Sequence, residues 1–152
     1  MQLPERHDSG TAARVVRRCP SAQESTPPPE VTAAIADIVA LLDGGAGDLS
    51  GVALDMEGVE DFDRKVYEVA RTIAPGETMS YGAIAARMGE PGAARDVGQA
   101  LGRNPFAVVV PCHRVVTADG GLGGFSAAGG SATKRRMLEI EGAAVAPPTL
   151  FG

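Results

Sequence analysis

Residues 106–115 read Phe-Ala-Val-Val-Val-Pro-Cys-His-Arg-Val, and they place a cysteine just after an uninterrupted hydrophobic run. The run, residues 106–110, predicts a buried strand because it is short, apolar and rich in valine. Cys112 would then stand at the exit of that strand, on a rigid base. A thiol presented in this way is a candidate nucleophile if a base or a positive charge lies near it.

His113 and Arg114 follow the cysteine and could supply that base and that charge. Neighbours on an extended chain point to opposite faces, so His113 needs a backbone turn or a bridging water to reach the sulfur. The bland alternative is that the cysteine is only a small buried hydrophobe. A cysteine hydrolase with a distant histidine is a poor alternative, because the other histidine, His7, lies in a segment that we expect to be weakly ordered.

The composition is typical of one soluble globular domain, with room for a small appendage. The chain has 152 residues, 44% hydrophobic and 22% charged, and such a chain can fold without a metal or a disulfide. Cys19 and Cys112 lie far apart in the sequence and neither has metal-ligand spacing. Neither a membrane span nor a signal peptide is evident. We therefore expect a cytoplasmic protein whose core needs no metal, and, since no heptad pattern or exposed apolar stripe is evident, a monomer.

Charge is distributed unevenly along the chain, whose formal net charge is −5. Residues 1–78 carry seven basic and fourteen acidic residues, whereas residues 79–136 carry seven basic and three acidic ones. A basic face on an acidic protein is typical of a protein that binds a phosphate backbone. Ordinary solvated charges would give the same pattern, so this observation leaves both interpretations open.

Three parts can be separated along the chain, namely residues 1–29, 30–60 and 61–152. The first is rich in Ser, Thr and Pro and ends in three prolines, which predicts weak order; only residues 13–16 suggest a strand. The second predicts a reduced N-terminal subdomain, consisting of a helix over 30–42 and an extended connector. In that helix the apolar residues Val31, Ile35, Ile38 and Leu42 fall at helical spacing.

The third part opens with a helix over 61–73 and continues with two short helices around a tight turn. These two helices are predicted over 81–88 and 93–102, and the sequence Gly89-Glu-Pro-Gly92 separates them, as in a helix-turn-helix. In the second of them Ala94, Gly98 and Gly102 recur every four residues and leave a ridge with almost no side chain. Such a ridge would admit a backbone or a groove, or would pack closely against another helix.

A glycine-rich loop over 120–130 and a closing helix over 131–141 complete the chain. The helical pattern predicts that Met137, Leu138 and Ile140 point inward and that Lys134, Arg135 and Arg136 point outward.

In this order and spacing, several motifs resemble the O6-alkylguanine-DNA alkyltransferases, also called methylated-DNA-protein-cysteine methyltransferases. The resemblance covers about residues 62–142. The motifs are Ile73-x-Pro-Gly-Glu-Thr-x-Ser-Tyr-Gly82, Ala93-Ala-Arg-x-Val-Gly98, Asn104-Pro105, Pro111-Cys-His-Arg-Val115 and Glu141-Gly142. It implies an α+β fold: a helical C-terminal alkyltransferase domain with a helix-turn-helix and a short buried strand pair, after a reduced N-terminal segment.

The resemblance also implies a reaction, which is DNA repair by direct damage reversal. The alkyl group, mainly methyl, would move from O6 of guanine in double-stranded DNA to Cys112, irreversibly and once per protein molecule, with no cofactor and no metal. His113 would take the thiol proton through a water, Glu141 would orient the imidazole, and Asn104 would support the turn. The damaged base must leave the duplex to be reached.

The residues expected at the DNA face are Tyr81, which helps to extrude the nucleotide, Arg95, which fills the vacated space, and Ala94, Gly98 and Arg103. Those expected in the substrate pocket are Val110, Arg114, Phe125 and Ser126. The sequence departs from the family pattern at Phe125, where many relatives have Tyr. The alternative is a non-catalytic lesion-binding protein or helix-turn-helix regulator like the alkyltransferase-like proteins, but these carry another residue, often Trp, where Cys112 stands.

Overall fold

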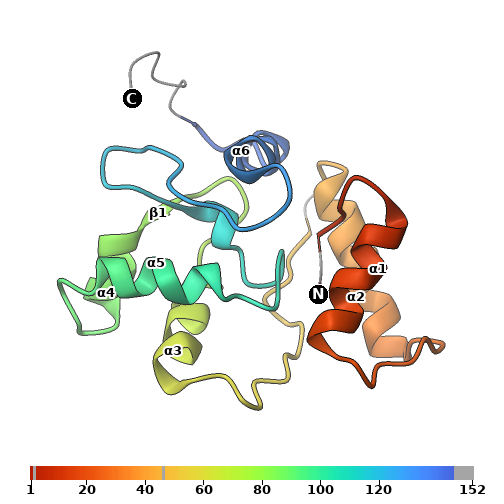
Figure 1. Ribbon diagram of the computed structural model, residues 1–152. Coiled ribbons are helices and arrows are strands. Elements are labelled where there is room, and N and C mark those ends of the chain that lie inside the picture. The colour runs from red at the N-terminus through yellow and green to blue at the C-terminus, as the bar shows by residue number, and fades with distance from the viewer. Residues whose placement is uncertain (2, 46, 146–152) are drawn as a thin grey trace.

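The structure is a computed structural model that describes residues 1, 3–45 and 47–145. Figure 1 shows helices α1 and α2 on the right, α3, α4 and α5 on the left, and α6 above them. Residues 146–152 of the predicted third part lie outside the described residues. None of the described helices is long and apolar enough to cross a membrane. The elements are α1 (Asp8–Arg18), α2 (Pro29–Leu42), α3 (Asp61–Ala70), β1 (Met79–Ser80), α4 (Tyr81–Arg87), α5 (Ala94–Gly102), a 3-10 turn η1 (Cys112–Arg114), β2 (Val115–Val116) and α6 (Gly130–Ile140).

Helices α3, α4 and α5 pack around the larger hydrophobic core. Val66 of α3, Ile84 of α4 and Val97 of α5 are fully buried in it. Tyr67 is also buried, and its hydroxyl donates to the carbonyl of Ala100 across 2.9 Å, which joins α3 to α5. The predicted helix pair is therefore confirmed, and α3 holds it in place.

The α+β class is confirmed, but the predicted strand over 106–110 is wrong. These residues form a tight turn, in which the backbone N–H of Val110 donates to the carbonyl of Phe106. The Asn104 side chain closes the turn: its Nδ2 donates to the Val110 carbonyl at 2.9 Å, and its Oδ1 accepts from the Phe106 N–H at 2.8 Å. The side-chain amide thus satisfies backbone groups that a strand would pair with a neighbour.

The strand pair lies elsewhere and is very short. β1 and β2 run parallel, with Met79 opposite Val115 and Ser80 opposite Val116. Because β2 directly follows η1 and α4 directly follows β1, this pairing ties the cysteine turn to the start of the helix-turn-helix. The Ser80 hydroxyl accepts from the Ala83 N–H and caps α4.

The N-terminal region differs from prediction in two ways. A helix, α1, covers residues 13–16, where a strand was suggested. The helix predicted over 30–42 is present as α2, but only part of its apolar set faces the core: Ile38 and Leu42 pack against it, whereas Val31 and Ile35 are 43% and 49% exposed. Leu41 joins a second core cluster with Val109 and Met137, so α2 is rotated relative to the face that periodicity indicated.

Candidate active site

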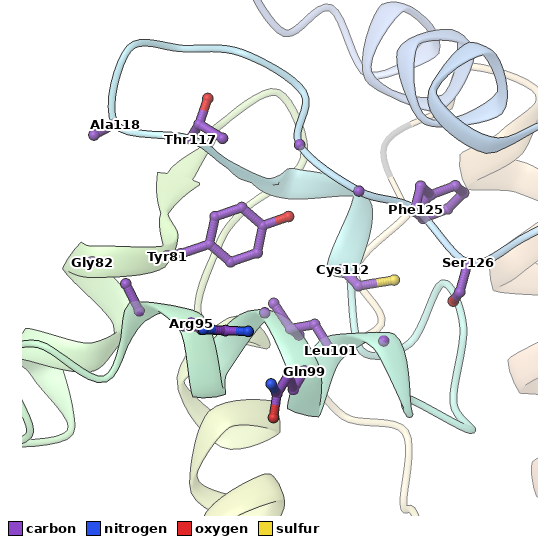
Figure 2. A pocket seen from close by; sticks show the side chains of 15 residues that line it. Tyr81, Gly82, Arg95, Gln99, Leu101, Cys112, Thr117, Ala118, Phe125 and Ser126 are labelled. Carbon is purple, nitrogen blue, oxygen red and sulfur yellow. The ribbon is translucent and has the colours of Figure 1, made fainter.

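Cys112 opens η1, where the backbone turns sharply. The Cys112 N–H donates to the Val110 carbonyl at 2.8 Å and the Arg114 N–H donates to the Pro111 carbonyl at 2.9 Å. The cysteine is half-buried and not in a disulfide. Figure 2 shows its sulfur pointing toward Phe125 and Ser126 and away from the Tyr81 ring. Because the backbone turns here, His113 and the sulfur are not separated as they would be on an extended chain.

A buried carboxylate organises the residues behind the cysteine. Nε2 of His113 lies 2.8 Å from Oε1 of Glu141, and the Arg114 guanidinium donates to both oxygens of the same carboxylate at 2.8 and 2.9 Å. Arg114 also donates to the Ile73 carbonyl at 2.7 Å. Burial alone would raise the pKa of Glu141, but the hydrogen bonds from His113 and Arg114 lower it to about 2. Glu141 is therefore ionised at neutral pH.

This arrangement leaves the other imidazole nitrogen available. Since Nε2 of His113 donates to Glu141, the neutral ring carries its lone pair on Nδ1. Nδ1 is buried and has no hydrogen-bond partner among the described residues. A buried polar atom without a partner calls for an explanation, and a proton-accepting role through a water is the one that its neighbour Cys112 favours.

The cysteine and the histidine rest in their neutral forms. Burial raises the pKa of the Cys112 thiol, although a hydrogen bond from Asn104 and the charge of Lys134 oppose this. Burial lowers the pKa of His113, and the Glu141 carboxylate opposes that shift. The thiol therefore needs the base at the moment of reaction, because a standing thiolate is disfavoured.

Lys134 is the functional side chain that the sequence prediction missed. It was expected to point outward, but it is fully buried. Its Nζ donates to the Val115 carbonyl at 2.6 Å and to the Tyr81 hydroxyl at 3.4 Å. Burial lowers its pKa to about 8, and the nearby Cys112 limits the shift. Helical periodicity could not predict this burial. The buried ammonium is stabilised by hydrogen bonds to carbonyls and a hydroxyl that only the folded chain brings together.

A cavity of about 850 Å³ opens in front of Cys112, and Figure 2 shows the side chains around it. The small-residue ridge of α5 lines this cavity and is not packed in the core, which decides between the two interpretations of that ridge. Besides the ridge residues Ala94, Gly98 and Gly102, the lining includes Tyr81, Arg95, Gln99, Leu101, Phe125 and Ser126. A cavity of this volume lies in the range of small-ligand sites.

Tyr81 is held between α5 and the glycine-rich loop. A Cβ atom on Gly98 would lie 3.8 Å from its ring, and one on Gly123 would lie only 2.9 Å from its hydroxyl oxygen. Gly123 has a φ of +65°, so the loop passes the hydroxyl at a point that suits glycine on both counts. Burial raises the pKa of Tyr81, so its hydroxyl stays protonated at neutral pH.

Three of the residues predicted for the DNA face or the substrate pocket lie away from the cavity lining. Val110 is fully buried and takes part through its carbonyl, which accepts from Asn104. Arg114 is committed to Glu141. Arg103 donates to both oxygens of Asp63 at 2.7 and 2.9 Å and so links α5 to α3. The remaining predicted residues lie in two groups beside the cavity. Cys112 and His113 are in η1, with Glu141 bound to His113, and the residues expected at the DNA face, Tyr81, Ala94, Arg95 and Gly98, lie along α4 and α5.

Candidate metal ligands do not cluster in the described part of the chain, where no group of three or more His, Cys, Asp or Glu could hold an ion.

Sequence comparisons relate this site to known proteins. A family model described as 6-O-methylguanine DNA methyltransferase, DNA binding domain, matches residues 61–143. The methylated-DNA-protein-cysteine methyltransferase of Mycobacterium tuberculosis is 50% identical over 109 residues, which cover 70% of this chain and 64% of the relative. That of Methanothermobacter thermautotrophicus is 40% identical over 119 residues, or 78% of this chain and 65% of the relative. The chain thus spans just under two thirds of these relatives.

Solved structures give the same relationship. The crystal structure of Mycobacterium tuberculosis OGT in complex with DNA aligns with a TM-score of 0.68 and 45% identity, covering 77% of this chain and 71% of that chain. The O6-methylguanine-DNA methyltransferase of the archaeon Pyrococcus kodakaraensis aligns with a TM-score of 0.67 and 33% identity, covering 87% of this chain and 75% of that chain.

Proposed function

Because the chain belongs to the 6-O-methylguanine DNA methyltransferase family, we propose that it repairs O6-alkylguanine in double-stranded DNA by moving the alkyl group, mainly methyl, to Cys112. One observation carries the proposal above all. A half-buried thiol faces a large cavity, and behind it lies a histidine whose free nitrogen is buried and whose other nitrogen is bound to Glu141.

The reaction follows from this geometry. The Cys112 thiol gives its proton to Nδ1 of His113 through a water, and the Glu141 carboxylate stabilises the imidazolium that forms. The thiolate attacks the alkyl carbon, so that a bond from sulfur to carbon forms while the bond from O6 to carbon breaks. The electron pair of the broken bond stays with guanine, which takes up a proton. A thioether has no ready leaving group, so each protein molecule reacts once.

DNA would be bound by α4 and α5. The ridge of α5 presents Ala94 and Gly98 where a groove must approach closely, and Arg95 stands beside the same cavity with no ion-pair partner among the described residues. Arg95 would occupy the space that a flipped nucleotide leaves, and Tyr81 lies across the cavity from it. Flipping is needed because the O6 alkyl carbon is inaccessible inside the duplex.

The direct test is mass spectrometry after incubation with a duplex that contains O6-methylguanine. We expect one added methyl group on the Cys112 peptide, at one equivalent per protein. Cys19 is an exposed free thiol and serves as an internal control that should stay unmodified. Cys112→Ala, and the same duplex with unmodified guanine, should give no adduct.

A different result would favour the non-catalytic alternative. If folded, reduced protein binds the damaged duplex more tightly than the undamaged one but leaves Cys112 unmodified, the protein is a lesion-binding protein and the transfer reaction is excluded.

The remaining expectations stay predictions. They are the division at residues 29 and 60, the monomeric state and the cytoplasmic location. Sedimentation of the purified protein, with and without duplex DNA, tests the oligomeric state directly.

A further inference from the structure

A second, narrow cavity adjoins Cys112 on the side of helix α1. Its lining includes Leu3, Arg14 and Arg18 from the N-terminal region and Cys112, Phe125 and Ser126 from the active site. The last three residues also line the large cavity, so they form the partition between the two. Figure 2 shows the Cys112 sulfur pointing toward this partition. Because Cys112 lines both cavities, a group bound to the sulfur can extend past this partition into the narrow cavity.

This cavity is small but has a movable wall. Its volume is about 30 Å³, roughly the space of one water. The Leu3 side chain is buried, whereas Arg18 is exposed and can change rotamer. A methyl group fits with little adjustment, and a longer substituent has to displace Arg18 or lie against it.

The charge of the wall is positive. Arg14 and Arg18 lie four residues apart on α1, hence on one face of that helix. Arg14 pairs with Glu5, but Arg18 forms no ion pair with any described residue. Acidic side chains are absent from the described lining, so the guanidinium of Arg18 is uncompensated there.

We propose that α1 forms the outer wall of the alkyl pocket, and that Arg18 favours an O6 substituent ending in a carboxylate over a neutral one of the same size. The proposal rests on the proposed alkyl transfer to Cys112. For a carboxymethyl group, Sγ would bond to the methylene carbon while the bond from O6 to that carbon breaks, and its electron pair stays with guanine. The carboxylate is only a substituent on the transferred carbon and would lie beside Arg18.

The test compares three duplexes that differ only at O6 of one guanine, which carries methyl, carboxymethyl or the neutral carbamoylmethyl group. Single-turnover rates of Cys112 modification are measured, and the ratio of the carboxymethyl to the carbamoylmethyl rate is taken for each protein. Any general change in DNA affinity cancels in this ratio. Arg18→Gln should lower the ratio about two- to fivefold, the range of an exposed ion pair, and Arg18→Glu should lower it further.

The matched control is Arg17→Gln. Arg17 is the neighbouring residue on the same helix, carries the same charge and does not line the narrow cavity, so its ratio should equal that of the unmodified protein. Equal ratios in the unmodified protein, Arg18→Gln and Arg18→Glu would overturn the proposal while the methyl duplex still reports transfer. Absence of transfer from all three duplexes would instead overturn the alkyl transfer itself.

Discussion

Residues 61–143 and residues 1–60 use their side chains in opposite ways. The first region buries three charged or polar side chains, His113, Arg114 and Lys134, and each of them makes at least one hydrogen bond. The second leaves Val31, Ile35 and Val39 of α2 about half exposed. Buried polar groups are fixed in one geometry because leaving them unpaired is energetically costly. Exposed apolar side chains contribute little to fixing the position of a helix. We infer that the first region carries out the reaction, as its machinery, and that the second mainly supports it.

The largest effect should come from removing the buried carboxylate with Glu141→Gln. We expect alkyl transfer to slow by about a hundredfold, since the imidazolium loses its counter-charge. Stability at pH 7 should fall by about 3 kcal/mol, because the pKa of Glu141 is lowered from 4.5 to about 2.

Single-turnover kinetics and urea unfolding measure these two effects. The sign is set by the lowered pKa: the stabilisation is present above pH 4.5 and is lost as pH falls toward 2. Glu141→Gln should therefore lose less stability over that pH range than the unmodified protein. Glu139→Gln, an acid two residues earlier on α6, is the control. An identical acid response in both variants would contradict the buried-carboxylate assignment.

A smaller effect is expected from Lys134→Met, which keeps most of the length of the side chain and removes its charge. The charge of Lys134 lowers the pKa of the Cys112 thiol, so its loss should raise that pKa and move the pH–rate profile to higher pH. The rate at pH 7 should fall severalfold, because less of the thiol is deprotonated there. In the unmodified protein the charge itself is lost above about pH 8, the pKa of Lys134.

Arg136→Met is the control for Lys134, because it removes a charge from the exposed face of the same helix. A profile that drops without shifting along the pH axis would assign Lys134 a purely structural part.

Within residues 61–143, replacing Arg95 and replacing Arg103 should have different effects on the transfer rate. Arg95→Ala should lower the transfer rate on duplex DNA by about tenfold, because its guanidinium stands free beside the cavity. Arg103→Ala should change the transfer rate by less than about threefold, because its guanidinium is committed to Asp63. Transfer rates at two salt concentrations check both. Equal losses would move Arg103 back to the DNA face where the sequence had placed it.

The smallest effect should come from Ile35→Gln on α2. Ile35 is 49% exposed, so we expect a change in unfolding free energy within about 0.5 kcal/mol and an unchanged transfer rate. Leu41→Ala on the same helix should cost about 2–4 kcal/mol, since Leu41 is buried. A large loss in Ile35→Gln would show that residues 1–60 are packed as tightly as the machinery.

Local patterns predicted most helices well. The helices over 81–88 and 93–102 begin and end within one residue of α4 and α5, because capping groups and glycines mark their ends. The strand over 106–110 failed for a reason that periodicity cannot contain. A single side chain, Asn104, satisfies the backbone of that run and turns it back on itself. The rotation of α2 could not be predicted for a similar reason. Whether Leu41 or Val31 is buried depends on which surface the helix packs against.

The sequence by itself determined the chemistry of this protein: a cysteine followed by a histidine, the helix-turn-helix and a glutamate after the last helix are all local patterns. Only the tertiary structure decided that Glu141 binds His113 and Arg114 together, that Lys134 turns inward to Tyr81, and that Arg18 reaches the cavity beside Cys112. These contacts join residues far apart in the chain. Their geometry depends on how the helices pack. The periodicity of side chains along one helix carries no information about the surface against which that helix packs.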